Sequence, residues 1–218
     1  MKTAAQPFQF VTASYLTRVN NQKAKNLDEL RLGIEQASDE SIFHHTFQSL
    51  GRYHFLREGF SNDFAQWVLA ALNRAELAEQ LAGLDVRDYP SLAELRGDLR
   101  RLVTSYCEAH PCDARQSGFE PFYFCEGIAV TVPLGLAAGT LAEFRKALAH
   151  VSHDTFYHHF IASRLRLHLG TNDFSYWFER DLESPDLARR ANRIDIYTNT
   201  LDTARDELIE MVEGELHT

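Results

Sequence analysis

Two matched sets of polar side chains are the residues of this chain that could do chemistry. Each set has a hydroxyl, an imidazole, a second hydroxyl and a guanidinium at positions i, i+4, i+8 and i+11. At about 100° per residue, these positions lie within roughly 80° of one another on a helix. Such a stripe could bind a carboxylate, a phosphate or a sugar. The two stripes are Ser41, His45, Ser49 and Arg52, and Thr155, His159, Ser163 and Arg166.

The solvent face of an amphipathic helix is the alternative interpretation of each stripe. Such a face needs polar residues, but it does not need the same His and the same Arg twice. The second stripe is also surrounded by apolar residues, among them Phe156, Phe160 and Leu165. We therefore expect the two stripes to line a shared polar cavity at the centre of the molecule.

Histidine and aspartate residues could alternatively hold a metal ion, and zinc or iron suits such ligands. One helix cannot bring His44, His45 and His54 to one ion, because His54 points almost opposite to His45. A metal site would have to combine helices, for instance His45 with His159 across the pseudo-twofold, or His54 with Asp63. The repeated Glu and Glu-x-x-His of di-metal bundles are missing, so hydrogen-bonded structural histidines are the favoured interpretation. The metal-ligand candidates are His44, His45, His54, Asp63, His158, His159, His168 and Asp173.

The elements that position these residues occur twice in the sequence. Residues 114 positions apart match through both His pairs, and a shifted register matches Asn62-Asp63-Phe64-x-x-Trp67 with Asn172-Asp173-Phe174-x-x-Trp177. Asn62 and Asn172 stand where helix N-caps belong, and the following Asp suits the first turn. The sequence predicts a first helical repeat over 7–107, a linker over 108–120 and a second helical repeat over 121–216.

Local patterns make each repeat mostly helical. A Phe-x-Phe segment opens each copy and alternates like a short strand, which in the second copy continues to Pro133. A short helix over 27–37 should precede a central helix from Asp39 to about Arg57. The expected fold is mainly α, with two pseudo-symmetric helical repeats packed as one unit and room for one short β-strand per repeat.

Composition narrows the setting and the partners. A net charge of −9 argues against nucleic-acid binding, which needs a basic face. No apolar run approaches a membrane span, and the N-terminus lacks a signal-peptide core, so no membrane partner is expected. Cys107, Cys112 and Cys125 have no metal-ligand spacing, which favours reduced thiols in the cytoplasm.

Several motifs resemble the bacterial domain-of-unknown-function 5752 family. They include Ser-Ile-Phe-His-His-Thr-Phe at 41–47, His54-Phe55-Leu56, the Asn-Asp-Phe motif at 62–68, and Gly-Thr-Asn-Asp-Phe-Ser at 170–175. The resemblance covers nearly the whole chain and implies a prokaryotic cytosolic protein. It brings no activity, cofactor or catalytic assignment. The first residue of the His pair is often aromatic in that family, which implies that His45 and His159 are the better candidates.

Two classes of function fit these residues. The first is a non-catalytic binding or regulatory module that holds an anionic small molecule, a sugar or a partner protein between the repeats. The alternative is a metal-dependent or acid–base enzyme that uses the duplicated histidines. The first is favoured because neither a complete ligand set nor a nucleophile–base pair is visible. The sequence assigns no catalytic residue.

Overall fold

A computed structural model of the protein describes residues 2–48, 60, 62–167, 169–195 and 199–217. Two long strands, β1 (Thr3–Ala24) and β2 (Phe122–Thr140), pair in an antiparallel two-stranded sheet. The helices between the strands are α1 (Leu27–Gln36), α2 (Asp39–Phe43), the π-helix η1 (His44–Gln48), α4 (Asp63–Leu72), α5 (Ala75–Ala82), the 3₁₀ turn η2 (Val86–Asp88), α6 (Leu92–Ala109) and α7 (Pro111–Ala114). After β2 come α8 (Leu141–Leu148), α9 (His153–Tyr157), the π-helix η3 (His158–Ala162), α10 (Ser163–Arg166), α11 (Asp173–Arg180), α12 (Pro185–Asn192) and α13 (Leu201–Leu216).

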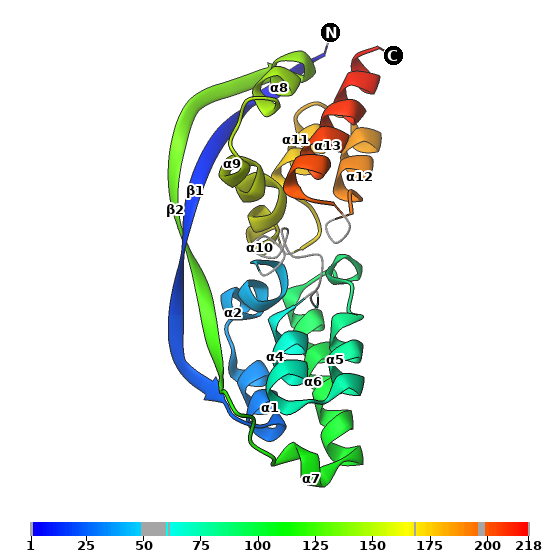
Figure 1. The fold of residues 1–218 in the computed structure, drawn as a ribbon. Coiled ribbons are helices and arrows are strands. Elements are labelled where there is room, and N and C mark those ends of the chain that lie inside the picture. Colours follow the sequence, from blue (N-terminus) through cyan, green and yellow to red (C-terminus); the bar gives the residue numbers. More distant parts are fainter. Residues whose placement is uncertain (1, 49–59, 61, 168, 196–198, 218) are drawn as a thin grey trace. The chain divides into compact units, whose positions relative to one another are not determined.

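The chain forms two compact units, and neither is a continuous stretch of sequence. Unit N consists of Leu16–Ile128 and His168–Gly170, with helices α1 to α7. Unit C consists of Met1–Tyr15, Ala129–Leu167 and Thr171–Thr218, with helices α8 to α13. Each unit therefore contains one half of β1 and one half of β2. In Figure 1, the helices of each unit lie on one side of its strand halves.

The exchange of strand halves places each Phe-x-Phe segment against the other repeat's helices. Phe8 belongs to unit C, where its ring contacts Phe144, Phe174 and Trp177. Phe122 belongs to unit N, where its ring contacts Phe64 and other core aromatics. Burial of these aromatic clusters is the main source of stability that ties each strand half to its helices.

Matched backbone contacts accompany this packing. The Trp67 indole N–H donates to the Glu120 carbonyl at 2.9 Å, and the Trp177 indole N–H donates to the Gln6 carbonyl at 2.8 Å. Glu120 and Gln6 are 114 residues apart, the separation that relates the two His pairs. These equivalences support the internal duplication and its boundaries, which remain a proposal.

The expected fold class was wrong. The strands span 22 and 19 residues rather than a few, and the helices divide between two units instead of packing as one. Periodicity missed most of both strands because a strand is recognised by one buried face. From Ile128 to Ala137, β2 is exposed on both faces, so no such pattern exists. Pro133 lies within β2 because both strands of a two-stranded sheet are edges, where Pro is tolerated.

The expected continuous α-helix from Asp39 to Arg57 was also wrong within the described residues. The α-helix ends at Phe43 and continues as the π-helix η1, and residues 49–57 lie outside the described part. The second copy repeats the change from α9 to η3. A π-turn shifts the hydrogen bonds from i+4 to i+5, so a spacing of 100° per residue does not hold here. The predicted N-caps Asn62 and Asn172 are confirmed, since both side chains accept a backbone N–H.

Among the described residues, the longest apolar stretches fall short of what a helix needs to cross a membrane.

One close approach yields a stability prediction. A Cβ added at Gly33 of α1 would lie 2.3 Å from the ring of the fully buried Phe124. Overpacking typically costs about 1–3 kcal/mol, whereas Ala in place of Gly gains about 1 kcal/mol in a helix. We expect the steric cost to win, so Gly33→Ala should lower the free energy of unfolding by about 1 kcal/mol in chemical denaturation.

The matched position in unit C supplies the control, because Ala147 stands 114 residues after Gly33. The variant Ala147→Gly should lose only the helix propensity and a little packing. A Gly33→Ala protein as stable as the native protein would show that the Phe124 ring moves aside without cost.

Candidate functional site

In unit C, the imidazole of His159 lies between a helix and a strand. Its Nε2 accepts the backbone N–H of Val11 at 2.9 Å. Its Nδ1 lies 2.7 Å from Oδ2 of Asp173 in the first turn of α11. Because Nε2 accepts a proton donor, Nδ1 carries the ring hydrogen and donates it to the carboxylate. The rings of Phe8 and Phe174 pack against this imidazole, which is buried.

Unit N contains the same arrangement. Nε2 of His45 accepts the backbone N–H of Cys125 in β2 at 2.9 Å, and Nδ1 lies 2.8 Å from Oδ2 of Asp63. The rings of Phe64 and Phe122 contact the imidazole. Cys125 and Val11 are 114 residues apart, so each unit repeats the whole Asp–His–amide chain, which we call a clasp.

A clasp satisfies an amide at the free edge of a strand. Such an amide would be costly to bury without an acceptor. A carboxylate that orients an imidazole is also the arrangement of a general base, but there Nε2 must be open to substrate. Here Nε2 is occupied by the strand amide, so proton transfer or metal ligation through it would require the strand to leave.

The other stripe residues of unit C do not line one polar surface. Thr155 and Ser163 are buried, and the hydroxyl of Ser163 donates to the carbonyl of His159 at 2.6 Å. Arg166 is half exposed and forms an ion pair with Asp173, the same carboxylate that orients His159. The sequence spacing therefore places Ser163, His159 and Arg166 next to one residue of another helix, Asp173 of α11.

The stripe of unit N is only partly described. Ser41 and His45 are buried, and Oγ of Ser41 has no hydrogen-bond partner within the described residues. Ser49, Arg52 and the metal candidate His54 lie outside the described residues, as does His168 of the second copy.

His158, the neighbour of the unit C clasp, contacts a residue that sequence reasoning missed. The hydroxyl of Tyr15 lies 2.8 Å from Nδ1 of His158. Burial first of all, together with the neighbouring His159 ring and the Arg166 guanidinium, lowers the pKa of His158 from its ordinary value to about 4. Burial also raises the pKa of Tyr15, so a protonated phenol faces a neutral imidazole and donates to it.

His44, His45 and Asp63 form a group that could hold a metal ion. Their candidate ligand atoms lie within 4.8 Å of one another. Both histidines are buried, and their rings meet edge to face. The His45–Asp63 distance of 2.8 Å is that of a hydrogen bond, which a bound ion would have to replace.

The backbone amides of Val11 and Cys125 are the parts of the site that sequence analysis did not find. Residue types reveal side-chain chemistry, whereas a backbone amide is present at almost every position. The available signal was the constant spacing, since Val11 and Cys125 follow the two Phe-x-Phe segments at the same offset.

Comparison with known proteins agrees with the sequence resemblance. The chain matches the model of the family described as "Family of unknown function (DUF5752)" over residues 5–213, and it belongs to that family. A bacterial source remains a prediction, because the similar solved structure comes from an archaeon.

That structure is described as "The structure of OrfY from Thermoproteus tenax". It is 29% identical, covers 99% of this chain and 98% of its own, and superposes with a TM-score of 0.86. None of the curated proteins matches the chain.

The clasp predicts a local effect of His159→Phe. Phenylalanine keeps the aromatic packing but leaves the Val11 amide without its acceptor. An unsatisfied buried amide costs about 1–3 kcal/mol. We expect His159→Phe to lower the free energy of unfolding by this amount. Relative to the native protein, hydrogen exchange should speed up more at the Val11 amide than at the other amides of β1. The variant His45→Phe is the control, and its effect should fall on the Cys125 amide instead. Unchanged exchange at Val11 would mean that the clasp does not hold the strand.

The buried His158 predicts a pH dependence. In the unfolded chain this imidazole binds a proton near its ordinary pKa of about 6.5, whereas in the folded chain it stays neutral down to a pKa of about 4. The unfolded state therefore binds more protons in this window, and stability falls as the pH drops from about 6.5 to 4. Denaturation curves of His158→Gln should lack this part of the decline. Tyr15→Phe should keep it, because burial is the first cause of the shift. Parallel curves for the native protein and His158→Gln would contradict this assignment.

Proposed function

We propose that this chain is a non-catalytic binding module whose partner is another protein. The observation that carries the proposal is an apolar segment of β2 in unit C. Its large side chains Val130, Val132, Leu134 and Leu136 are 37–53% exposed. Clustered apolar exposure of this kind is typical of surfaces that bind other proteins. We call these four residues the apolar ribbon.

Charge supports the apolar ribbon as a docking surface. Residues 127–142 contain no charged side chain, in a chain whose net charge is −9. A partner that covers residues 127–142 removes no charged side chain of this segment from water, so it meets no cost of desolvating charge there. A protein partner with an apolar patch fits this chemistry.

The geometry of β2 favours contact through side chains rather than through added strand pairing. Alternation along a strand places Val130, Val132 and Leu134 on one face. Pro133 has no N–H to donate, and Gly135 has a φ of +66°, which breaks the regular edge. The partner should therefore pack on the face of the ribbon.

The two clasps support a non-catalytic role. Each imidazole already uses both ring nitrogens, one on a carboxylate and one on a strand amide. On this proposal the duplicated histidines are structural. Among the stripe residues that the structure describes, Arg166 is half exposed and could meet an anionic small molecule or sugar in competition with Asp173. Cys107 and Cys112 are free thiols, which supports a reducing compartment such as the cytoplasm.

A site-specific photocrosslinking experiment tests the ribbon. A photoreactive phenylalanine derivative replaces Val132 in the full chain inside its host cell, and the control carries it at the exposed Glu210 of α13. We expect a discrete adduct with another protein at position 132 and none at position 210. The additional change Val130→Lys should remove the adduct. No adduct, or equal adducts at both positions, would overturn the proposal, and an adduct only between copies of this chain would replace it with self-association.

Metal-dependent chemistry at His44, His45 and Asp63 is the second candidate, favoured by the proximity of their ligand atoms. Elemental analysis of the purified protein distinguishes the two. Stoichiometric zinc or iron that disappears in Asp63→Asn would support the metal site. Protein without bound metal that also fails to bind added zinc would remove this candidate.

A further inference from the structure

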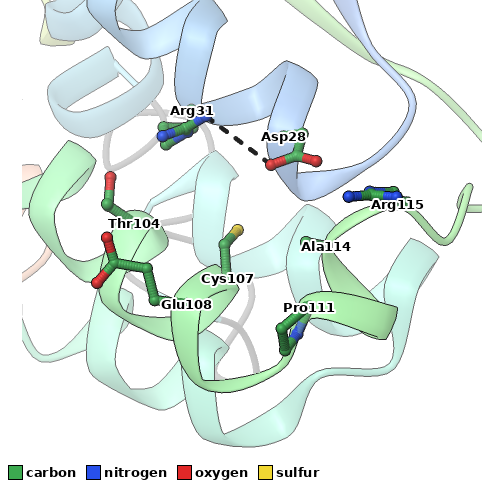
Figure 2. A pocket seen from close by; sticks show the side chains of 8 residues that line it. All are labelled: Asp28, Arg31, Thr104, Cys107, Glu108, Pro111, Ala114 and Arg115. Atoms are coloured by element: carbon green, nitrogen blue, oxygen red, sulfur yellow. Dashed lines mark ion pairs between the residues drawn. The ribbon is translucent and has the colours of Figure 1, made fainter.

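Unit N contains a pocket that none of the candidate site residues lines. It lies where α1, α6 and α7 meet, has a volume of about 270 Å³, and is shown in Figure 2. Its lining residues are Asp28, Arg31, Thr104, Cys107, Glu108, Pro111, Ala114 and Arg115. The volume is below the range of about 300–1,000 Å³ that is typical for drug-sized ligands, so a small metabolite fits it best.

Two guanidinium groups, those of Arg31 and Arg115, bring positive charge to the wall of the pocket. Arg31 approaches Asp28 at 3.9 Å, which is too long for a hydrogen bond, and its buried Nε has no partner within the described residues. Arg115 follows α7, and Figure 2 draws no ion pair between it and the other lining residues. A guanidinium has five N–H donors, so both side chains can take a further acceptor.

Two carboxylates, those of Glu108 and Asp28, bring negative charge to the wall of the same pocket. Glu108 lies across Cys107 from Arg115 in Figure 2, and no ion pair joins it to the other lining residues. With Asp28, the wall carries two carboxylates and two guanidinium groups. A simple anion would meet two carboxylates, and a simple amine would meet two guanidinium groups, so neither alone matches the wall.

The floor between the charged ends is small and nearly apolar. Cys107 and Ala114 are buried, and Pro111 lies beside them. Burial raises the pKa of the Cys107 thiol to about 11, so the sulfur is a neutral packing surface rather than a nucleophile. The hydroxyl of Thr104 donates to the Arg100 carbonyl at 2.8 Å and keeps its lone pairs for an incoming N–H.

We propose that this pocket binds a free amino acid, with its carboxylate on Arg115 and its ammonium on Glu108. The ligand carries both charges on a small frame, as the wall does. Its side chain would lie over Cys107 and Ala114, and the size of the pocket limits it to a small amino acid. The inference does not depend on the apolar ribbon, which belongs to the other unit.

The test titrates the full chain with each of the twenty common L-amino acids by isothermal calorimetry, with acetate and ethylamine as single-charge controls. At least one amino acid should bind saturably, while the two controls should not. Arg115→Gln and Glu108→Gln should each weaken that binding about tenfold or more, since each removes a charge-assisted contact. Arg189→Gln is the matched control, because Arg189 is an exposed residue of the other unit.

The proposal is overturned if no amino acid binds, if acetate binds equally well, or if both charge variants bind like the native protein.

Discussion

One interaction underlies the arrangement of both units: a strand amide donated to a histidine that an aspartate orients. A strand at the edge of a sheet presents N–H groups that must find acceptors. Val11 and Cys125 meet this demand through His159 and His45, and each imidazole is fixed by an aspartate in the first turn of a later helix, α11 or α4. The bond sets the depth at which each Phe-x-Phe segment enters its aromatic cluster. The caps and π-turns then place the imidazole at the required position.

If the two halves are repeats, as we propose, an exchange of strand segments between them accounts for the discontinuous compact units. The Phe-x-Phe segment of each predicted repeat packs on the helices of the other repeat. Neither repeat therefore buries its own Phe-x-Phe segment. Small differences between the copies then become informative. Tyr15 contacts His158 in unit C, whereas the matched position in the other copy is Ala129. Gly33 admits the Phe124 ring, whereas Ala147 occupies the matched position.

Local rules predicted what depends on local chemistry. Asn62 and Asn172 cap their helices because a short amide side chain reaches the N–H three residues on, wherever the helix packs. The family resemblance followed from long motifs. The length of β1 and β2 could not be predicted, because a strand exposed on both faces has no apolar alternation. The hydrogen bond between His159 and Val11 could not be predicted either. It joins residues 148 positions apart, and its donor is a backbone N–H, which almost every residue has.

That separation has a consequence for synthesis of the chain on the ribosome. The segment around Phe8 leaves the ribosome before its acceptor His159, which follows 148 residues after Val11. At about 5–20 residues per second, the nascent strand waits roughly 7–30 seconds with its phenylalanines uncovered. The strand around Phe122 has no such delay, because helices α1 to α7 precede it. During this interval, the segment around Phe8 is open to chaperones and to a neighbouring chain on the same messenger RNA.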